Sequence, residues 1–261
     1  MRVARTLVAT ALAAAMLVGP AVPAADAGPA APTQAEPRDP VVVIPGTLAG
    51  EPLVEVDIQA LADALRSEGY AVYIYWLPGN GVGDMRETAA GLPAFVTDVL
   101  AWTGADAVDL VGHSQGGLLA RYYVRFLGGD GVVDSLVSLG APHYGTQLAN
   151  LASLFGSWNC IGVGVCTQAA VGSAFLAELN AGDDTPGGAR YTTFTTRFDE
   201  IVLPYTNALL RGDGNLNVII QQQCPLRVVE HLALPNDVAV QGGVVDALEG
   251  HPITLDCSAL L

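Results

Sequence analysis

Apolar runs of strand length alternate with stretches of helical spacing along much of the chain. Val41 to Ile44 is a continuous β-branched run of the kind that forms a buried parallel strand. Ala71 to Trp76, Val108 to Val111 and Val132 to Leu139 predict three further strands. Between the first two strands, Asp57 to Glu68 carries its apolar residues on one face and stops before a glycine, which predicts a helix.

The remaining segments continue this order of elements. Pro78 to Gly83 holds three glycines and predicts a loop, and a helical stretch follows to about Trp102, with Pro93 near the start of its main segment. Arg190 to Phe198 and Asn217 to Gln221 predict two later strands. Helices spaced as crossovers between strands favour an α/β fold, with a mainly parallel central sheet covered by helices on both sides.

From Gln147 to Ala189 the alternation of strand and helix patterns is no longer clear. Apolar segments there lie on either side of a short loop bounded by two cysteines. This segment, residues 147–189, is expected to form an insertion over the strand ends. A lid or an acyl-binding wall would fit such a position, and two ordinary packing helices would give the same pattern.

The first 27 residues have the features of a secretory signal peptide. Arg2 and Arg5 precede an apolar run from Leu7 to Val18, and small residues follow around Ala25-Asp26-Ala27. Cleavage is expected after Ala27, with Ala25 as the alternative. A membrane anchor would need about 18 consecutive apolar residues, and prolines interrupt this run before it reaches that length. Residues 28–40, rich in Pro and Ala, predict a disordered leader, and residues 41–261 a single domain.

Composition narrows the classes of partner. Hydrophobic residues make up 51% of the chain and charged residues 14%, as in a compact globular protein. The formal net charge of -15 repels phosphate backbones and makes nucleic acid an unexpected partner. No stretch beyond the N-terminal run is long and apolar enough to span a bilayer. We therefore expect a secreted protein without an integral membrane span.

Four cysteines in an exported chain indicate two disulfides, for which three pairings are possible. Cys160 with Cys166 would close a small local loop, and Cys224 with Cys257 would tie the last segment to the body. No cysteine or histidine spacing is typical of a zinc site, so no metal site is expected.

A tight turn between a strand and a helix carries the strongest chemical signal. The run Gly112-His113-Ser114-Gln115-Gly116 follows an apolar strand and opens a helical pattern. Glycines flanking the serine allow a sharp, strained turn that exposes the hydroxyl. Because an ordinary strand-to-helix turn can show the same short pattern, other parts of the chain must supply a base and an acid before a nucleophile is inferred.

The expected order in such sheets is nucleophile, acid, histidine, which excludes the histidines at 113 and 143 as the base. His231 follows a strand-like pair and is preferred over His251, which lies in a turn-like setting before a proline. Asp199, at the end of a predicted strand, is the preferred acid. The weaker acid candidates are Glu200, Asp183, Asp184 and Asp213.

An acyl-transfer site also needs donors for the oxyanion of the tetrahedral intermediate. The residue after the nucleophile, Gln115, and the loop after the first strand, at Thr47, are the expected sources. The threonine could offer both its amide and its hydroxyl. A triad with these donors supplies the whole mechanism, so no cofactor is expected.

With these residues in view, the chain resembles the α/β-hydrolases of the Candida antarctica lipase B type. The resemblance rests on the segments at 41–47, 114–118 and 199–204 and on a Cys-Pro-Leu segment before His231. It implies Ser114, Asp199 and His231 as the triad, Thr47 and Gln115 as the oxyanion hole, a Cys224–Cys257 bridge, and hydrolysis of carboxylic esters including acylglycerols. It also implies substrate contacts from Ile201 and its neighbour Val202.

Two departures from this resemblance bear on selectivity. His113 stands where the family member has a tryptophan beside the alcohol-side pocket, so a different substrate contact is expected there. Only 30 residues follow His231, so the C-terminal helical portion that covers the family's acyl channel is expected to be shortened or absent. A more open cleft, suited to bulky or polymeric esters, is the resulting prediction.

The sequence therefore predicts a secreted, monomeric serine ester hydrolase, with lipase activity as the leading hypothesis and a lipid or ester as the substrate. A polyesterase or cutinase-like enzyme and an acyltransferase are the alternatives within the enzyme class. A catalytically inactive secreted binding protein on the same scaffold is the alternative outside it.

Overall fold

A computed structural model describes residues 38–147 and 163–259 of the chain. Six strands form one sheet in the order β2-β1-β3-β4-β5-β6, and every neighbouring pair is parallel. The strands are β1 (Val41–Ile44), β2 (Val72–Ile74), β3 (Val108–His113), β4 (Val133–Leu139), β5 (Arg190–Thr195) and β6 (Asn215–Ile219). The expected α/β fold with a parallel central sheet is confirmed.

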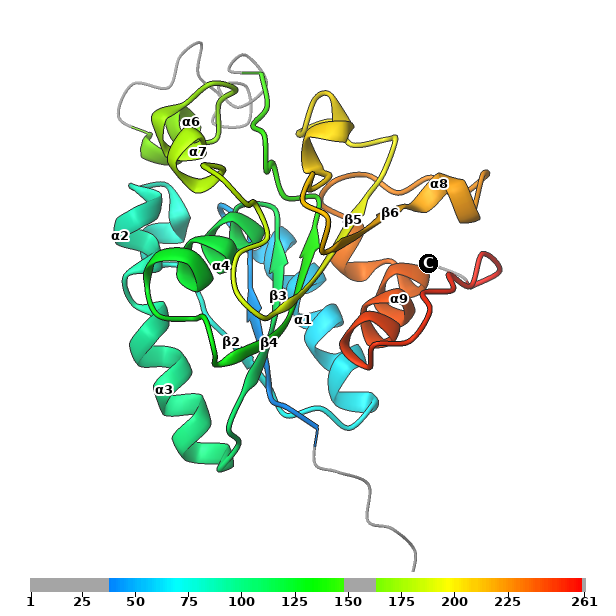
Figure 1. Cartoon of the computed structure of the whole chain (residues 1–261). Helices are drawn as coiled ribbons and strands as arrows, with labels where there is room; N and C mark the ends of the chain where they lie inside the picture. Colours follow the sequence, from blue (N-terminus) through cyan, green and yellow to red (C-terminus); the bar gives the residue numbers. More distant parts are fainter. Residues whose placement is uncertain (1–37, 148–162, 260–261) are drawn as a thin grey trace, which may run out of the picture. The chain divides into compact units, whose positions relative to one another are not determined.

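Helices cover both faces of this sheet (Figure 1). The α-helices are α1 (Pro52–Ser67), α2 (Met85–Ala89), α3 (Leu92–Thr103), α4 (Gln115–Phe126), α6 (Gly164–Gln168), α7 (Ala174–Leu179), α8 (Ile220–Gln223) and α9 (Val238–Leu248). Short 3-10 helices are η1 (Pro78–Gly81), η2 (Tyr205–Ala208) and η3 (Leu234–Asn236).

Alternate residues of each strand serve two separate cores. Val42 and Ile44 of β1 pack in a cluster with α2, α3, α4 and α7, whereas Val41 and Val43 pack with α1 and α9. All four side chains are completely buried. Since successive side chains of a strand point to opposite faces, a strand covered on both sides must be apolar throughout. The continuous apolar run that predicted β1 reflects this burial.

The register of the parallel strands brings their carboxyl ends to one edge of the sheet. Ile44 of β1 lies beside Gly112 of β3, and Gly112 lies beside Ser138 of β4. Loops that follow β1, β3, β4 and β5 therefore start at the same edge, where ligands bind in open α/β sheets.

Several elements differ from the sequence prediction. Strand β6 begins at Asn215 and gives way to the short helix α8 at Ile220, and helix α9 has no counterpart among the predicted elements. Within the predicted insertion at 147–189, the structure describes α6 and α7, while residues 148–162 lie outside the described residues. The predicted signal peptide and most of the leader also lie outside them.

Cys224 and Cys257 form a disulfide that ties the segment after α9 to the end of α8. The predicted partner of Cys166, Cys160, lies outside the described residues. Among the helices of the described ranges, none combines the length and the hydropathy that crossing a bilayer requires.

Candidate active site

Ser114 occupies the predicted turn between β3 and α4 in a strained conformation. Its φ and ψ angles are 54° and -120°, a region that residues with a Cβ atom rarely adopt. The amide of Ser114 still bonds to the carbonyl oxygen of Leu139 at 2.8 Å, which fixes the turn to β4. A side chain at Gly116 would collide with the carbonyl group of Ile44, so only glycine allows the helix to start this close to β1.

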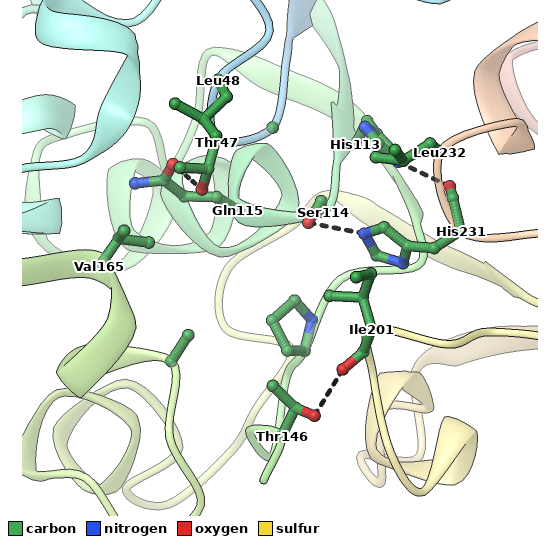
Figure 2. Close-up of a pocket in the computed structure, with 13 residues that line it drawn as sticks. Thr47, Leu48, His113, Ser114, Gln115, Thr146, Val165, Ile201, His231 and Leu232 are labelled. Carbon is green, nitrogen blue, oxygen red and sulfur yellow. Dashed lines mark hydrogen bonds between the residues drawn. The ribbon is translucent and has the colours of Figure 1, made fainter. Parts of the chain in front are cut away.

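His231 connects the serine hydroxyl to a buried carboxylate. Its Nε2 lies 2.9 Å from Ser114 Oγ, and its Nδ1 lies 2.8 Å from Asp199 Oδ2. The Asp199 carboxylate can only accept, so His231 Nδ1 donates to it and carries the proton of the neutral ring. The Nε2 lone pair is then free to accept from the serine hydroxyl. The structure thus brings together the three side chains predicted for a serine triad. Figure 2 shows the contact between Ser114 and His231.

Backbone amides hold the Asp199 carboxylate. Asp199 lies in the turn after β5, where the strand ends at Thr195, three residues earlier than predicted. Its Oδ1 accepts hydrogen bonds from the amides of Ile201 at 3.0 Å and Val202 at 2.6 Å. These bonds leave Oδ2 for the imidazole and fix its direction.

The loop carrying His231 is held from two sides. The Thr196 hydroxyl donates to the carbonyl oxygen of Val229 at 2.8 Å, which links the segment before Asp199 to the segment before His231. Glu200, the nearest rival acid in sequence, accepts from the backbone amide of His231 at 3.0 Å. Glu200 therefore contacts the backbone of His231, not its ring.

The other candidate acids and bases lie elsewhere. Asp184 is buried and accepts from the amides of Arg211 and Gly212 at 2.8 and 2.7 Å, as a loop anchor would. The ring of His251 is exposed and lies 3.1 Å from Glu249. Asp183 accepts from the amide and hydroxyl of Thr185. The remaining candidate, Asp213, lies in the exposed turn before β6.

Thr47 and Gln115 lie together on the side of Ser114 opposite to His231 (Figure 2). The Thr47 hydroxyl donates to Gln115 Oε1 at 2.8 Å, and Gln115 Nε2 donates to the carbonyl oxygen of Gly81 at 3.0 Å. The side chain of Gln115 thus connects the loop after β1 to the loop at η1. Its own amide opens α4, where backbone donors have no partner within the helix.

An apolar pocket opens on the Ser114 hydroxyl (Figure 2). Its walls come from the loop after β1, the turn at Ser114, helix α6 and the loops after β4, β5 and α8. The apolar side chains of this lining belong to Leu48, Pro142, Val165, Ala169, Ile201 and Leu232. Of these the sequence predicted Ile201. A mostly apolar pocket with a few convergent polar groups fits an acyl chain.

His113 borders the pocket but is almost wholly buried. Its Nε2 lies 3.0 Å from the carbonyl oxygen of His231, so Nε2 carries the proton and Nδ1 is left as a buried acceptor without a partner in the described residues. Burial, followed by the charge of His231, lowers the pKa of His113 to about 3. The ring stays neutral and is hydrogen-bonded to the backbone of the loop that carries His231, in addition to any substrate contact.

One predicted substrate contact is wrong. Val202 is completely buried and is not part of the pocket lining. Its amide donates to Asp199 Oδ1, and this bond turns the valine side chain into the core while the neighbouring Ile201 faces the pocket. Residues of adjacent sequence point in different directions in such a turn, which an apolar pattern alone does not reveal.

Thr146 is a site residue that sequence reasoning missed. Its hydroxyl donates to the carbonyl oxygen of Ile201 at 2.6 Å and accepts from the amide of Leu203 at 2.9 Å. It also borders the pocket. Its position in the loop that follows β4, at the carboxyl edge of the sheet, was the available signal.

The parallel sheet, the strained serine turn and the order serine, aspartate, histidine together define the class of α/β-hydrolases. Within this class, the chain belongs to the class 2 lipase family, whose model matches residues 38–240. The expected membership among α/β-hydrolase lipases is confirmed.

Curated relatives are triacylglycerol lipases. That of Burkholderia plantarii is 37% identical over 161 residues, which cover 57% of this chain and 43% of that protein. That of Pseudarthrobacter phenanthrenivorans is 35% identical over 127 residues, 45% of this chain and 37% of that protein. The matched region thus spans less than half of either relative.

Solved structures share the fold at lower identity. Aspergillus fumigatus lipase B has a TM-score of 0.66 at 22% identity, with 85% of this chain and 55% of that chain covered. A mature Bacillus licheniformis lipase has a TM-score of 0.61 at 20% identity, with 77% of this chain and 88% of that chain covered.

Proposed function

We propose that the protein is a secreted serine ester hydrolase that acts as a triacylglycerol lipase through an acyl-enzyme on Ser114. The observation that carries this proposal is the hydrogen-bonded series from Ser114 Oγ through His231 to Asp199, at 2.9 and 2.8 Å. The distance of 2.9 Å is within the range in which a base can take the proton of a nucleophile, and the bond of 2.8 Å orients that base.

In the first half-reaction, Ser114 Oγ attacks the ester carbonyl carbon while His231 Nε2 takes the hydroxyl proton. Asp199 holds the ring in the required tautomer and stabilises the imidazolium that forms. The carbonyl oxygen becomes an oxyanion, to which the amides of Thr47 and Gln115 donate. The imidazolium then protonates the leaving alcohol, and the carbon–oxygen bond to that alcohol breaks.

In the second half-reaction, water replaces the alcohol. His231 Nε2 takes a proton from the water as its oxygen attacks the acyl carbon. The second tetrahedral intermediate then collapses: the bond between the acyl carbon and Ser114 Oγ breaks, and the imidazolium returns its proton to Oγ, which releases a carboxylic acid and free Ser114. The same groups act in both halves, so the residues of this chain supply the complete cycle.

The pocket supports an apolar acyl group as the preferred ligand. Val165 and Ala169 of the predicted insertion contribute apolar surface next to Ile201, which favours the acyl-wall interpretation of that segment. The names of the curated relatives support acylglycerols as the substrate class.

The cleft is expected to be open on the side of the C-terminal segment. Helix α9 packs on the sheet through Val240 and Val244 in the core shared with α1, so this helix covers the sheet and not the pocket. Leu232 is the pocket residue from the chain after His231. Bulky esters therefore belong among the substrates to be compared.

The proposed protein is exported from the cell and is a monomer. The Cys224–Cys257 bridge suits an oxidising compartment. The charged, apolar and small-residue regions of residues 1–27 support a signal peptide. Sequencing of the N-terminus of the exported protein tests the cleavage site, since cleavage after Ala27 leaves residue 28 as the first residue. Light scattering of the purified protein tests the monomeric state.

A fluorophosphonate probe and a set of esters test the activity. Wild-type protein is expected to react with the probe and to hydrolyse tributyrin and a long-chain triglyceride, and Ser114→Ala is expected to lose both reactions. Ser67→Ala, which changes an exposed serine at the end of α1, is the matched control. Faster hydrolysis of polyester film, or ester synthesis with an acceptor alcohol, would favour the polyesterase or acyltransferase alternative. An unreactive wild type would favour a binding protein.

A further inference from the structure

Three carboxylates gather at the edge of the sheet opposite to Ser114. Asp39 precedes β1, Asp109 is the second residue of β3, and Asp134 is the second residue of β4. One oxygen from each carboxylate lies within 4.8 Å of the other two. Asp109 pairs with Val41, the first residue of β1, so the cluster lies at the amino ends of three neighbouring strands.

Asp109 is the unusual member of this cluster. It is 3% exposed, and its Oδ1 has no hydrogen-bond partner among the described residues. Burial, and then the charges of Asp39 and Asp134, raise the pKa of this carboxyl to about 7, although a hydrogen bond with Ser135 opposes the shift. A buried carboxylate is costly unless a positive charge or a proton compensates it.

Arg190 compensates another member of the cluster. Its Nη2 donates to Asp134 Oδ2 at 2.8 Å, to Ser135 Oγ at 2.5 Å and to the carbonyl oxygen of Leu248 at 3.0 Å. Its hydrogen bonds within the described residues reach neither Asp39 nor Asp109. This guanidinium therefore donates to one of the three carboxylates, and Asp109 Oδ1 keeps no hydrogen-bond partner among the described residues.

We propose that Asp39, Asp109 and Asp134 bind a divalent cation, with Ca²⁺ as the ion that fits best. Ca²⁺ takes six to eight oxygen ligands at about 2.3 to 2.6 Å, so two ligands of one ion lie up to about 5 Å apart. The separation of 4.8 Å or less in this cluster fits that limit. Water can complete the shell beside the partly exposed Asp39 and the exposed Asp134. Mg²⁺ demands a more regular octahedron.

The role of this cation site is structural. Asp109 and Ser114 lie five residues apart along β3 and the turn that follows it, roughly 16 Å at about 3.3 Å per residue. A bound ion would link the segment entering β1 to β3 and β4. It would raise the stability of the fold and leave the chemistry at the other edge unchanged.

Thermal unfolding in metal-free buffer and in buffer with added CaCl₂ tests this proposal. With a dissociation constant of about 10⁻⁴ to 10⁻³ M, 10 mM CaCl₂ should raise the Tm of the wild type by roughly 3 to 10 °C. NaCl at equal ionic strength, and MgCl₂, are the reference salts. Esterase activity at 25 °C should be equal with and without CaCl₂.

Three variants locate the effect. Asp109→Asn and Asp39→Asn should each lose most of the calcium-dependent rise in Tm. The matched control, Asp213→Asn, removes an exposed carboxylate from another loop and should keep that rise. If Asp109→Asn fails to fold, Asp39→Asn decides, because its side chain is partly exposed.

An unchanged wild-type Tm in CaCl₂, or a rise that persists in Asp39→Asn and Asp109→Asn, would overturn the proposal. The first result would mean that a proton, not a metal ion, compensates Asp109. Neither result bears on the serine chemistry, which the fluorophosphonate experiment tests separately.

Discussion

The backbone amide of His231 donates a hydrogen bond to Glu200 Oε2 at 3.0 Å, while the ring of the same histidine bonds to Asp199. Two adjacent acidic residues thus hold one histidine, the first through its imidazole and the second through its main chain. The difference between these contacts leads to different expectations for the two carboxylates.

Asp199→Asn should lower kcat by about 10⁴-fold and change KM little. The amide can donate towards Nδ1, which favours the wrong tautomer of His231 and removes the charge that stabilises the imidazolium. Steady-state hydrolysis of a soluble p-nitrophenyl ester measures this loss. A loss below tenfold would assign the role of the acid to another residue.

Glu200→Ala should lower kcat by about tenfold, because it removes an acceptor that fixes the backbone of His231. Glu200→Gln should stay within about threefold of the wild type, since its amide oxygen can still accept from the same N–H. The kinetics of both variants on the same ester check this. A collapse of activity in Glu200→Gln would indicate that Glu200 acts through its charge.

Thr47→Val should lower kcat by about threefold to tenfold, the value of one neutral hydrogen bond. The Thr47 hydroxyl donates to Gln115 Oε1, so it positions the loop. The amide of Thr47, the proposed oxyanion donor, is unchanged in this variant. Thr47→Ser keeps the hydroxyl and serves as the control. A loss of 10² to 10³-fold in Thr47→Val alone would show that the hydroxyl itself reaches the oxyanion.

The buried, neutral His113 should make the fold less stable in acid. The pKa of His113 is about 3 in the folded state, below its ordinary value of 6.5. Between these values the unfolded chain binds a proton that the folded chain excludes, so stability falls as pH drops from 6.5 towards 3. The slope approaches about 1.4 kcal/mol per pH unit.

Urea unfolding of the wild type and His113→Phe at pH 7, 6 and 5 measures this contribution. The difference in unfolding free energy between the two proteins should shift in favour of the variant as pH falls. His251→Phe, at an exposed ring, controls for the loss of an imidazole as such. Parallel pH curves for the wild type and His113→Phe would contradict the prediction.

Removal of the Cys224–Cys257 bridge should cost about 3 to 4 kcal/mol, because the bond closes a segment with a sequence separation of 33. For a domain of this size the expected fall in Tm is roughly 6 to 16 °C. Calorimetry of the double variant Cys224→Ala, Cys257→Ala measures it. An unchanged Tm would show that the unfolded chain is not restrained by this bond.

The features that the sequence predicted are those with a local cause. Val41–Ile44 is a strand because burial on both faces requires an unbroken apolar run. The turn at Ser114 was predicted because its flanking glycines and helical pattern are contiguous in the chain. Asp199 and His231 followed from the order that the fold imposes on such residues.

The features that it did not predict depend on contacts between distant segments. Helix α9 holds valines and adjacent glycines, which are poor helix formers, and its pattern therefore gave no helical signal. At Gly243 a side chain would lie 2.8 Å from Phe194 and Leu255, so tertiary packing selects the residue. The roles of Glu200 and Val202 depend on a turn whose geometry no periodic pattern encodes.

The left-handed backbone at Ser114 has a thermodynamic consequence. A glycine adopts such angles at little cost, whereas a residue with a Cβ atom loses of the order of 1 to 3 kcal/mol there. Ser114→Gly should therefore melt at a higher temperature than the wild type. Thermal stability and the proposed catalytic role of Ser114 would then be in conflict at a single position, and a selection for thermal stability alone would favour loss of the serine.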